Sequence, residues 1–363
     1  MARKSAGFRV FALVCLLWPF TAMTQTDAVA PAACAKCHVE ALTQPSTYMA
    51  HALETVENSK VLTDHPVLTT TVGRYTYRIE RKGNESEYSV TDGASTVTLP
   101  IRWTMGASSA LGQTYILEKD DALYESRVSW FRELSGLAPT MGYEGIPAKD
   151  LNDAAGRMIH QDEKLRCFGC HATNAVQGKQ LTYEKLLPGV QCAHCHQGID
   201  AHLAAALAGN PQAAAPQDLH KLIGLSADQA SNFCGQCHRT WAEIAAQPNL
   251  GIANIRFQPY RLTSSKCYDP DDARISCLAC HNPHHDFSNP RTVSFDAKCL
   301  ACHAGGKPVV GKVIVAKPGA KACPVAKENC ISCHMPRIEL PGAHYKFTDH
   351  RIRIVKPNEA YPG

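Results

Sequence analysis

Long hydrophobic runs and excess charge are both scarce in this sequence. Beyond the N-terminus, no stretch of the 363 residues is apolar enough to cross a bilayer, so we expect no transmembrane span in the mature chain. Charged residues make up 19% of the chain, and the formal net charge is only +4. A charge this close to neutral gives no indication of a nucleic-acid partner.

The one apolar run, from Val10 to Phe20, follows the basic residues Arg3, Lys4 and Arg9. It is too short for a comfortable membrane span, and small or polar residues follow it, which is typical of a secretory signal peptide. We therefore expect residues 1–25 to be a signal peptide that is cleaved near residues 22–26. The alternative is an uncleaved N-terminal anchor. Export would place the mature chain in the periplasm, an oxidising compartment.

Seventeen cysteines are far too many for an ordinary cytoplasmic enzyme, and fourteen of them form the pattern Cys-x-x-Cys-His seven times. Two thiols three residues apart can add to the two vinyl groups of one porphyrin, and the next imidazole can bind the iron as proximal ligand. The pattern therefore predicts seven covalently attached haem c groups, each with its iron. The attachment cysteines are Cys34, Cys37, Cys167, Cys170, Cys192, Cys195, Cys234, Cys237, Cys277, Cys280, Cys299, Cys302, Cys330 and Cys333. The proximal histidines are His38, His171, His196, His238, His281, His303 and His334.

Two other uses of paired cysteines fit the pattern poorly. Zinc ribbons need no histidine directly after each cysteine pair, and seven pairs cannot form four-cysteine sites without a remainder. Thioredoxin-like redox motifs occur singly, in a strand–helix–strand context that this sequence lacks.

The seven motifs are unevenly spaced along the chain. The first stands alone, whereas the other six fill residues 167–334, or 28 residues for each motif. So little polypeptide cannot build an ordinary side-chain core, so the porphyrins must form the core. We therefore expect a fold that is mainly α with long loops, a haem-cored multihaem cytochrome c. Haems this crowded would lie near van der Waals contact and conduct electrons.

The spacer after the first motif differs from the rest. Across residues 68–133, β-branched and aromatic residues alternate with polar ones, and turn signals stand between them, which predicts a small antiparallel β subdomain of four to six strands. It would cover the first haem or serve as a docking surface. The expected divisions are a signal peptide (1–25), a first haem segment (26–66), a β-rich spacer (67–140) and a hexahaem cytochrome domain (141–363).

Ten histidines remain after the seven proximal ones, which suggests that most irons carry a second imidazole. Two such ligands keep the iron six-coordinate and low-spin, so that little moves on electron transfer and no site stays open for substrate. For each candidate, the alternative is a surface or hydrogen-bonding histidine. The candidate distal ligands are His51, His65, His160, His202, His220, His284, His344 and His350.

Two cysteines of the mature chain, Cys267 and Cys323, lie outside the seven motifs. In an oxidising compartment they would most simply form a disulfide that ties together the segments around the fifth and seventh motifs. Two free buried thiols or a cysteine axial ligand are the alternatives.

Several runs resemble one family of bacterial multihaem cytochromes c: CFGCHAT, PGVQCAHCHQGIDAH, CGQCHR, SCLACHNPHH, NCISCHMP and FTDHRI. The family is related to the tetrahaem cytochrome that takes electrons from hydroxylamine oxidoreductase. The resemblance is clearest over residues 167–354. It implies a mostly helical fold with stacked haems, with His202, His284 and His350 as distal ligands and with Cys267 and Cys323 in structural roles.

Two functions of different classes follow. The first, which we favour, is an electron carrier between a redox protein donor and an acceptor, neither of which the sequence names. The second is an oxidoreductase that acts on a small nitrogen or sulfur compound at one open haem. No lysine replaces the histidine in any motif, so the substrate haem of pentahaem nitrite reductases is not indicated.

Overall fold

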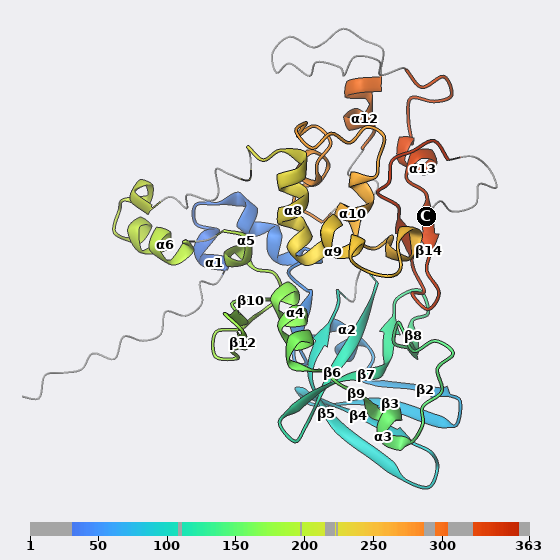
Figure 1. Cartoon of the computed structure of the whole chain (residues 1–363). Coiled ribbons are helices and arrows are strands. Elements are labelled where there is room, and N and C mark those ends of the chain that lie inside the picture. Colours follow the sequence, from blue (N-terminus) through green and yellow to red (C-terminus); the bar gives the residue numbers. More distant parts are fainter. Residues whose placement is uncertain are drawn as a thin grey trace, which may run out of the picture.

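The computed structural model describes residues 31–107, 111–196, 198–214, 222, 224–286, 295–303 and 322–355. A helical part carries most of the cysteine motifs, and a large sheet lies beside it (Figure 1). The chain is 32% helical and 26% strand, so the expectation of a mainly α fold was wrong.

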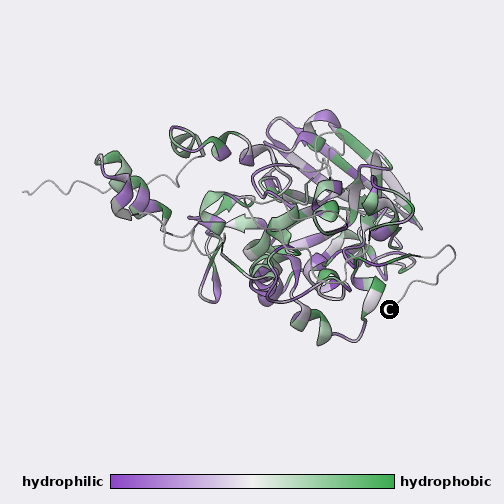
Figure 2. Cartoon of the chain, turned by 90° about the horizontal axis from the view of Figure 1, so that it is seen from above, coloured by the Kyte–Doolittle hydropathy of each residue, from purple (hydrophilic) through white to green (hydrophobic). Residues whose placement is uncertain are grey.

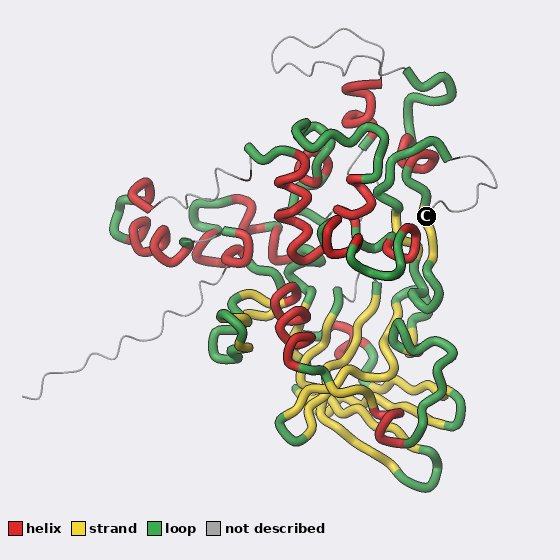
Figure 3. Tube along the Cα trace, viewed as in Figure 1, coloured by secondary structure: helices red, strands yellow, loops and turns green. Residues whose placement is uncertain are grey.

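Nine antiparallel strands form the main sheet, which is nearly closed because the outer strands β2 and β8 approach one another (Figure 3). Seven strands follow one another in chain order from β2 to β8, while β1 pairs with β5 and β9 pairs with β7. The strands are β1 (Leu53–Thr55), β2 (Val67–Val72), β3 (Tyr75–Lys82), β4 (Glu85–Thr91), β5 (Thr96–Met105), β6 (Gly112–Lys119), β7 (Ala122–Phe131), β8 (Gly136–Pro139) and β9 (Gly156–Met158).

Alternating apolar residues explain the central strands. In β3, Tyr75, Tyr77 and Ile79 are buried while their neighbours in sequence are more exposed, which is the period-two pattern of a sheet with one covered face. The turn between β3 and β4 has Gly83 at a φ of 66°, a left-handed conformation that glycine adopts without a Cβ clash.

The sheet is larger than the four to six strands expected because it recruits short segments from outside the alternating stretch. Strands β1, β8 and β9 have three or four residues each and are too short to carry a clear alternation of their own. They become strands because β5 and β7 offer backbone hydrogen-bonding groups that need partners.

The helices are short, and the longest has twelve residues. They are α1 (Pro31–Cys34), α2 (Lys60–Asp64), α3 (Leu151–Ala155), α4 (Gln161–His171), α5 (Cys192–Cys195), α6 (Ile199–Leu207), α8 (Ala227–His238), α9 (Trp241–Ala245), α10 (Gln258–Thr263), α11 (Cys277–Cys280), α12 (Asp296–His303) and α13 (Cys330–His334), with the 3-10 turns η1 (Val39–Leu42), η2 (Gln44–Ser46), η3 (Pro211–Ala214) and η4 (Gly251–Asn254).

Three two-stranded ribbons complete the described part of the chain. They pair β10 (Ala172–Thr173) with β13 (Leu187–Pro188), β11 (Val176–Gln177) with β12 (Gln180–Leu181), and β14 (Arg337–Glu339) with β15 (Lys346–Thr348). No helix among the described residues is long and apolar enough to cross a membrane.

Buried apolar side chains are concentrated in and around the sheet. One large cluster and a second, smaller one are built mainly on its strands, whereas the cluster of the helical part has only four buried members, Ile255, Ile338, Ala343 and Phe347. Hydrophobic and hydrophilic residues are mixed along the ribbons (Figure 2). The helical part therefore has little side-chain core for its size, as expected for a polypeptide that wraps another group.

Candidate functional site

Each of the seven cysteine motifs lies in a helix or at its end. The motifs fall at the ends of α1, α4, α5, α8, α11, α12 and α13. Cysteines three residues apart lie on the same face of a helical turn, so both sulfurs can reach one porphyrin edge. The histidine that follows is fixed by the same turn: the backbone N–H groups of His38, His196 and His281 donate to the carbonyl of the first cysteine at 2.9, 2.9 and 2.8 Å.

Motifs that are distant in sequence lie side by side. The thiols of Cys170 and Cys237 contact one another, as do those of Cys234 and Cys277. Further contacts join Cys34 to Cys192 and Cys299 to Cys330. The first motif is thus next to the third, the second next to the fourth, the fourth next to the fifth, and the sixth next to the seventh.

Three proximal histidines face a second histidine ring. The ring centroids are 6.1 Å apart for His38 and His202, 6.0 Å for His196 and His284, and 6.2 Å for His281 and His350. A metal–imidazole bond is about 2 Å long, so two imidazoles on opposite sides of one iron have centroids about 6 Å apart. The described residues therefore fit three irons with two histidine ligands each.

Hydrogen bonds orient two further proximal histidines, His171 and His334, and the distal candidate His350. The Nδ1 of His171 lies 2.9 Å from the carbonyl of Ala52, and that of His334 lies 2.8 Å from the carbonyl of Arg353. The Nδ1 of His350 lies 3.0 Å from the carbonyl of Thr348. A carbonyl acceptor places the ring proton on Nδ1, which leaves the lone pair of Nε2 for a metal.

Burial favours the neutral form of His171, His281 and His350, which is the form that binds a metal. It lowers the pKa of His281 to about 4, with smaller contributions from His350 and His238. Burial is also the largest cause that lowers the pKa values of His171 and His350.

Residues 143–197 match the family model of cytochrome c554 and c-prime. This match supports a c-type cytochrome that transfers electrons through covalently bound haem c and its iron. The matched segment contains the second and third cysteine motifs. No curated protein and no solved structure matches the chain.

Of the other five candidate distal histidines, four lie among the described residues and make other contacts. His65 lies beside Trp130 and His344 beside Phe131, at centroid distances of 6.0 and 4.8 Å. His51 bonds to Glu54 at 2.8 Å, and this bond is the main reason that its pKa is raised. His160 is the N-cap residue that precedes α4, and His220 lies outside the described residues. Their ligand roles stay predictions.

The second motif is attached to the sheet, which the sequence did not indicate. Phe168, between its two cysteines, is fully buried and packs edge-to-face on Trp103 of β5 and on Tyr183. The sequence did contain a signal for this contact: Phe168 stands between the two cysteines, where the attachment of a haem requires no large apolar residue.

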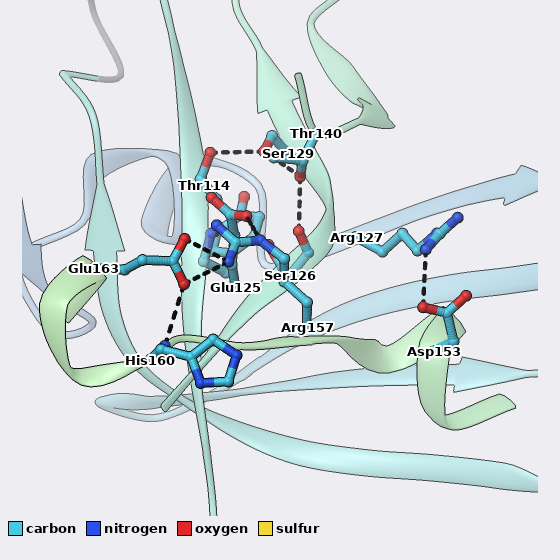
Figure 4. Close-up of polar contacts among 11 residues, drawn as sticks. Thr114, Glu125, Ser126, Arg127, Ser129, Thr140, Asp153, Arg157, His160 and Glu163 are labelled. Atoms are coloured by element: carbon cyan, nitrogen blue, oxygen red, sulfur yellow. Dashed lines mark hydrogen bonds and ion pairs between the residues drawn. The ribbon is translucent and has the colours of Figure 1, made fainter. Parts of the chain in front are cut away.

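An ion-pair cluster makes a second connection between α4 and the sheet. Arg157 of β9 lies 2.8 Å from Glu125 of β7 and 2.9 Å from Glu163 of α4, and Glu163 also accepts the backbone N–H of His160 (Figure 4). Together with Phe168, these contacts fix the first turns of α4 and the attachment loop on the same face of the sheet.

A buried ion pair beside His350 was also missed. Arg261 of α10 binds Asp349 through two hydrogen bonds, both 2.9 Å long. The signal in the sequence was an aspartate directly before a candidate ligand, although its partner lies 88 residues away.

The disulfide between Cys267 and Cys323 stays a prediction. The Cys267 sulfur lies close enough to Cys280 and Cys299 to affect their pKa values, so it adjoins the fifth and sixth motifs. The backbone N–H groups of Ala326 and Val325 donate to Cys323 and lower the pKa of its thiol.

Proposed function

We propose that the chain is an exported heptahaem c-type cytochrome that passes electrons along a chain of mostly bis-histidine haems. One observation carries the proposal: three proximal histidines each face a distal-candidate ring at the spacing of two ligands on one iron. The match to the cytochrome c554 and c-prime family supports it independently.

Bound haem supplies an iron that accepts and releases one electron reversibly. The protein contributes the attachment and the ligand field. Cysteine pairs fix each porphyrin at one edge, and the imidazoles of His38 and His202, for example, would hold the iron from both sides. Because neither ligand has to move between the two redox states, electron transfer requires little rearrangement.

The contacts between motifs support a conducting chain rather than isolated haems. Porphyrins attached at Cys170 and Cys237 would be neighbours, and so would those attached at Cys234 and Cys277. The fourth motif therefore adjoins both the second and the fifth. We propose that electrons pass through the fourth haem on their way between the N-terminal and C-terminal motifs.

The test is the intact mass of the exported protein together with a pyridine haemochrome count. We expect seven haems for each chain, loss of residues 1–25 within a few positions, and a mass two hydrogens lower if Cys267 and Cys323 are joined. A colourless exported protein, or one that contains zinc, would contradict the proposal.

Electron paramagnetic resonance separates the carrier from the oxidoreductase. Spectra with only low-spin ferric signals are expected for the carrier. A high-spin signal that shifts with nitrite or hydroxylamine would instead indicate an open haem that acts on a small nitrogen compound.

A further inference from the structure

The most completely buried ion pair among the described residues lies beside a proposed haem ligand. The side chains of Arg261 and Asp349 are 1% and 0% exposed. The guanidinium of Arg353 binds the same carboxylate at 2.7 Å, and the backbone N–H of Arg351 donates to it at 3.0 Å. With the two bonds from Arg261, the carboxylate accepts four hydrogen bonds.

Such a cluster is an unusual way to gain stability. Burying charges costs desolvation energy that their mutual attraction often only offsets, whereas removal of one partner leaves an uncompensated buried charge. A fully satisfied buried network does, however, fix its members in one geometry. The carboxylate of Asp349 is therefore suited to hold neighbouring groups in place.

One group is His350, the next residue, whose ring faces His281 of the fifth motif. Ser265 holds the same segment from the other side: its hydroxyl donates to the carbonyl of His350 at 3.2 Å and accepts the N–H of Ile352 at 2.8 Å. The backbone on both sides of His350 is thereby fixed to the helical part.

The other group is His334 of the seventh motif. Its Nδ1 lies 2.8 Å from the carbonyl of Arg353, and the N–H of Arg353 donates back to the carbonyl of His334 at 3.2 Å. The Arg353 side chain is held by Asp349, so one carboxylate fixes both the acceptor for His334 and the position of His350. The β14–β15 ribbon connects the two histidines along the chain.

We propose that Asp349, held by Arg261 and Arg353, is a positioning residue that serves the fifth and seventh haem irons together. These three residues are named the C-terminal clamp. It holds His350 on the distal side of the fifth iron and holds the carbonyl that orients proximal His334 on the seventh. The proposal rests on the proposed function, since it requires haem at both motifs.

Asp349→Asn in the exported holoprotein is the first test, because asparagine keeps the volume but removes the charge. We expect the haem count of the wild type, a new high-spin ferric signal as His350 leaves its iron, and upward shifts in midpoint potential. We expect the potentials to rise for two reasons. Without an oriented carbonyl acceptor, the His334 imidazole would donate less electron density to its iron, and the site would also lose one negative charge.

Asp153→Asn is the matched control, since it makes the same change in an ion pair far from both motifs in sequence, in which Arg127 of β7 and Asp153 of α3 lie 3.3 Å apart. This control should keep the wild-type spectrum and potentials. If Asp349→Asn does not fold, Arg353→Gln removes the charged hydrogen bond that this arm of the clamp makes to Asp349, and a smaller high-spin fraction is expected.

Wild-type low-spin spectra and potentials in a folded Asp349→Asn protein with the full haem count would overturn the clamp but leave the proposed function intact. The same result for a folded Arg353→Gln protein would overturn it if Asp349→Asn does not fold. Absence of haem from the wild-type protein would overturn both proposals, so the haem count distinguishes the two failures.

Discussion

Adjacent histidines differ sharply in their surroundings at the start of the loop after the fifth motif. The ring of His284 lies 6.0 Å from that of His196 and is inclined to it by only 6°, whereas His285 is exposed. If His284 is the distal ligand of the third iron, His284→Ala should convert one low-spin haem to high-spin without changing the haem count. Magnetic circular dichroism and electron paramagnetic resonance measure this conversion.

His285→Ala is the control for that experiment, because it removes the same side chain one position away. It should leave the spectra unchanged. Equal effects of the two substitutions would contradict the assignment of His284.

The parts of the site that depend on local geometry could be predicted from the sequence, and the long-range parts could not. The spacing within Cys-x-x-Cys-His is local and fixes the attachment group by itself. His202 and His38, in contrast, are 164 positions apart in sequence, so only the packing of α6 against the first motif brings their rings together. The sequence supplied eight distal candidates but no physical basis for pairing them with irons.

At the scale of elements, helix α4 shows how an attachment helix can be packed against a sheet. Phe168 is fully buried between its cysteines, whereas Leu278, at the same position of the fifth motif, is 36% exposed. Phe168→Ala should lower the free energy of unfolding by about 3 kcal/mol or more, because it opens a cavity beside Trp103. Urea or thermal unfolding of the holoprotein measures the change.

Leu278→Ala provides the matched control and should change the free energy of unfolding by about 0.5 kcal/mol or less, as is usual for surface positions. A similar loss for both variants would show that the attachment loops need a large apolar residue in general, and that packing of Phe168 on the sheet is not special.

The sheet itself was only partly predictable. Alternation identified the region of β3, where Tyr75, Tyr77 and Ile79 point to one side, because that pattern is local. The number of strands depended on pairing between segments that are far apart in sequence. For example, β9 pairs with Tyr124, Glu125 and Ser126 of β7 after a connection of more than twenty residues. Crowding of the proposed haems would account for the short helices, but it gave no information about a spacer with a core of its own.

At the scale of the whole molecule, the two parts of the chain should depend on haem to different degrees. The large apolar cluster belongs to the sheet, and it includes side chains that are fully buried, such as Tyr88 and Tyr115. Among the described residues, the helical part has a buried cluster of four apolar side chains, and its cysteines are exposed or half-buried. Because stability rises with the apolar area that a fold buries, we expect the sheet, and not the helical part, to remain folded by itself.

We therefore predict that the chain made without residues 1–25, in a compartment that attaches no haem, keeps its sheet folded and loses its helical part. Hydrogen exchange followed by mass spectrometry should show slow exchange over β1 to β9 and fast exchange over α8, α10 and α13, whereas the holoprotein should protect both. Protection of α8 and α10 without haem would mean that side chains alone stabilise these helices, and the argument that porphyrins form the core of that part would then fail.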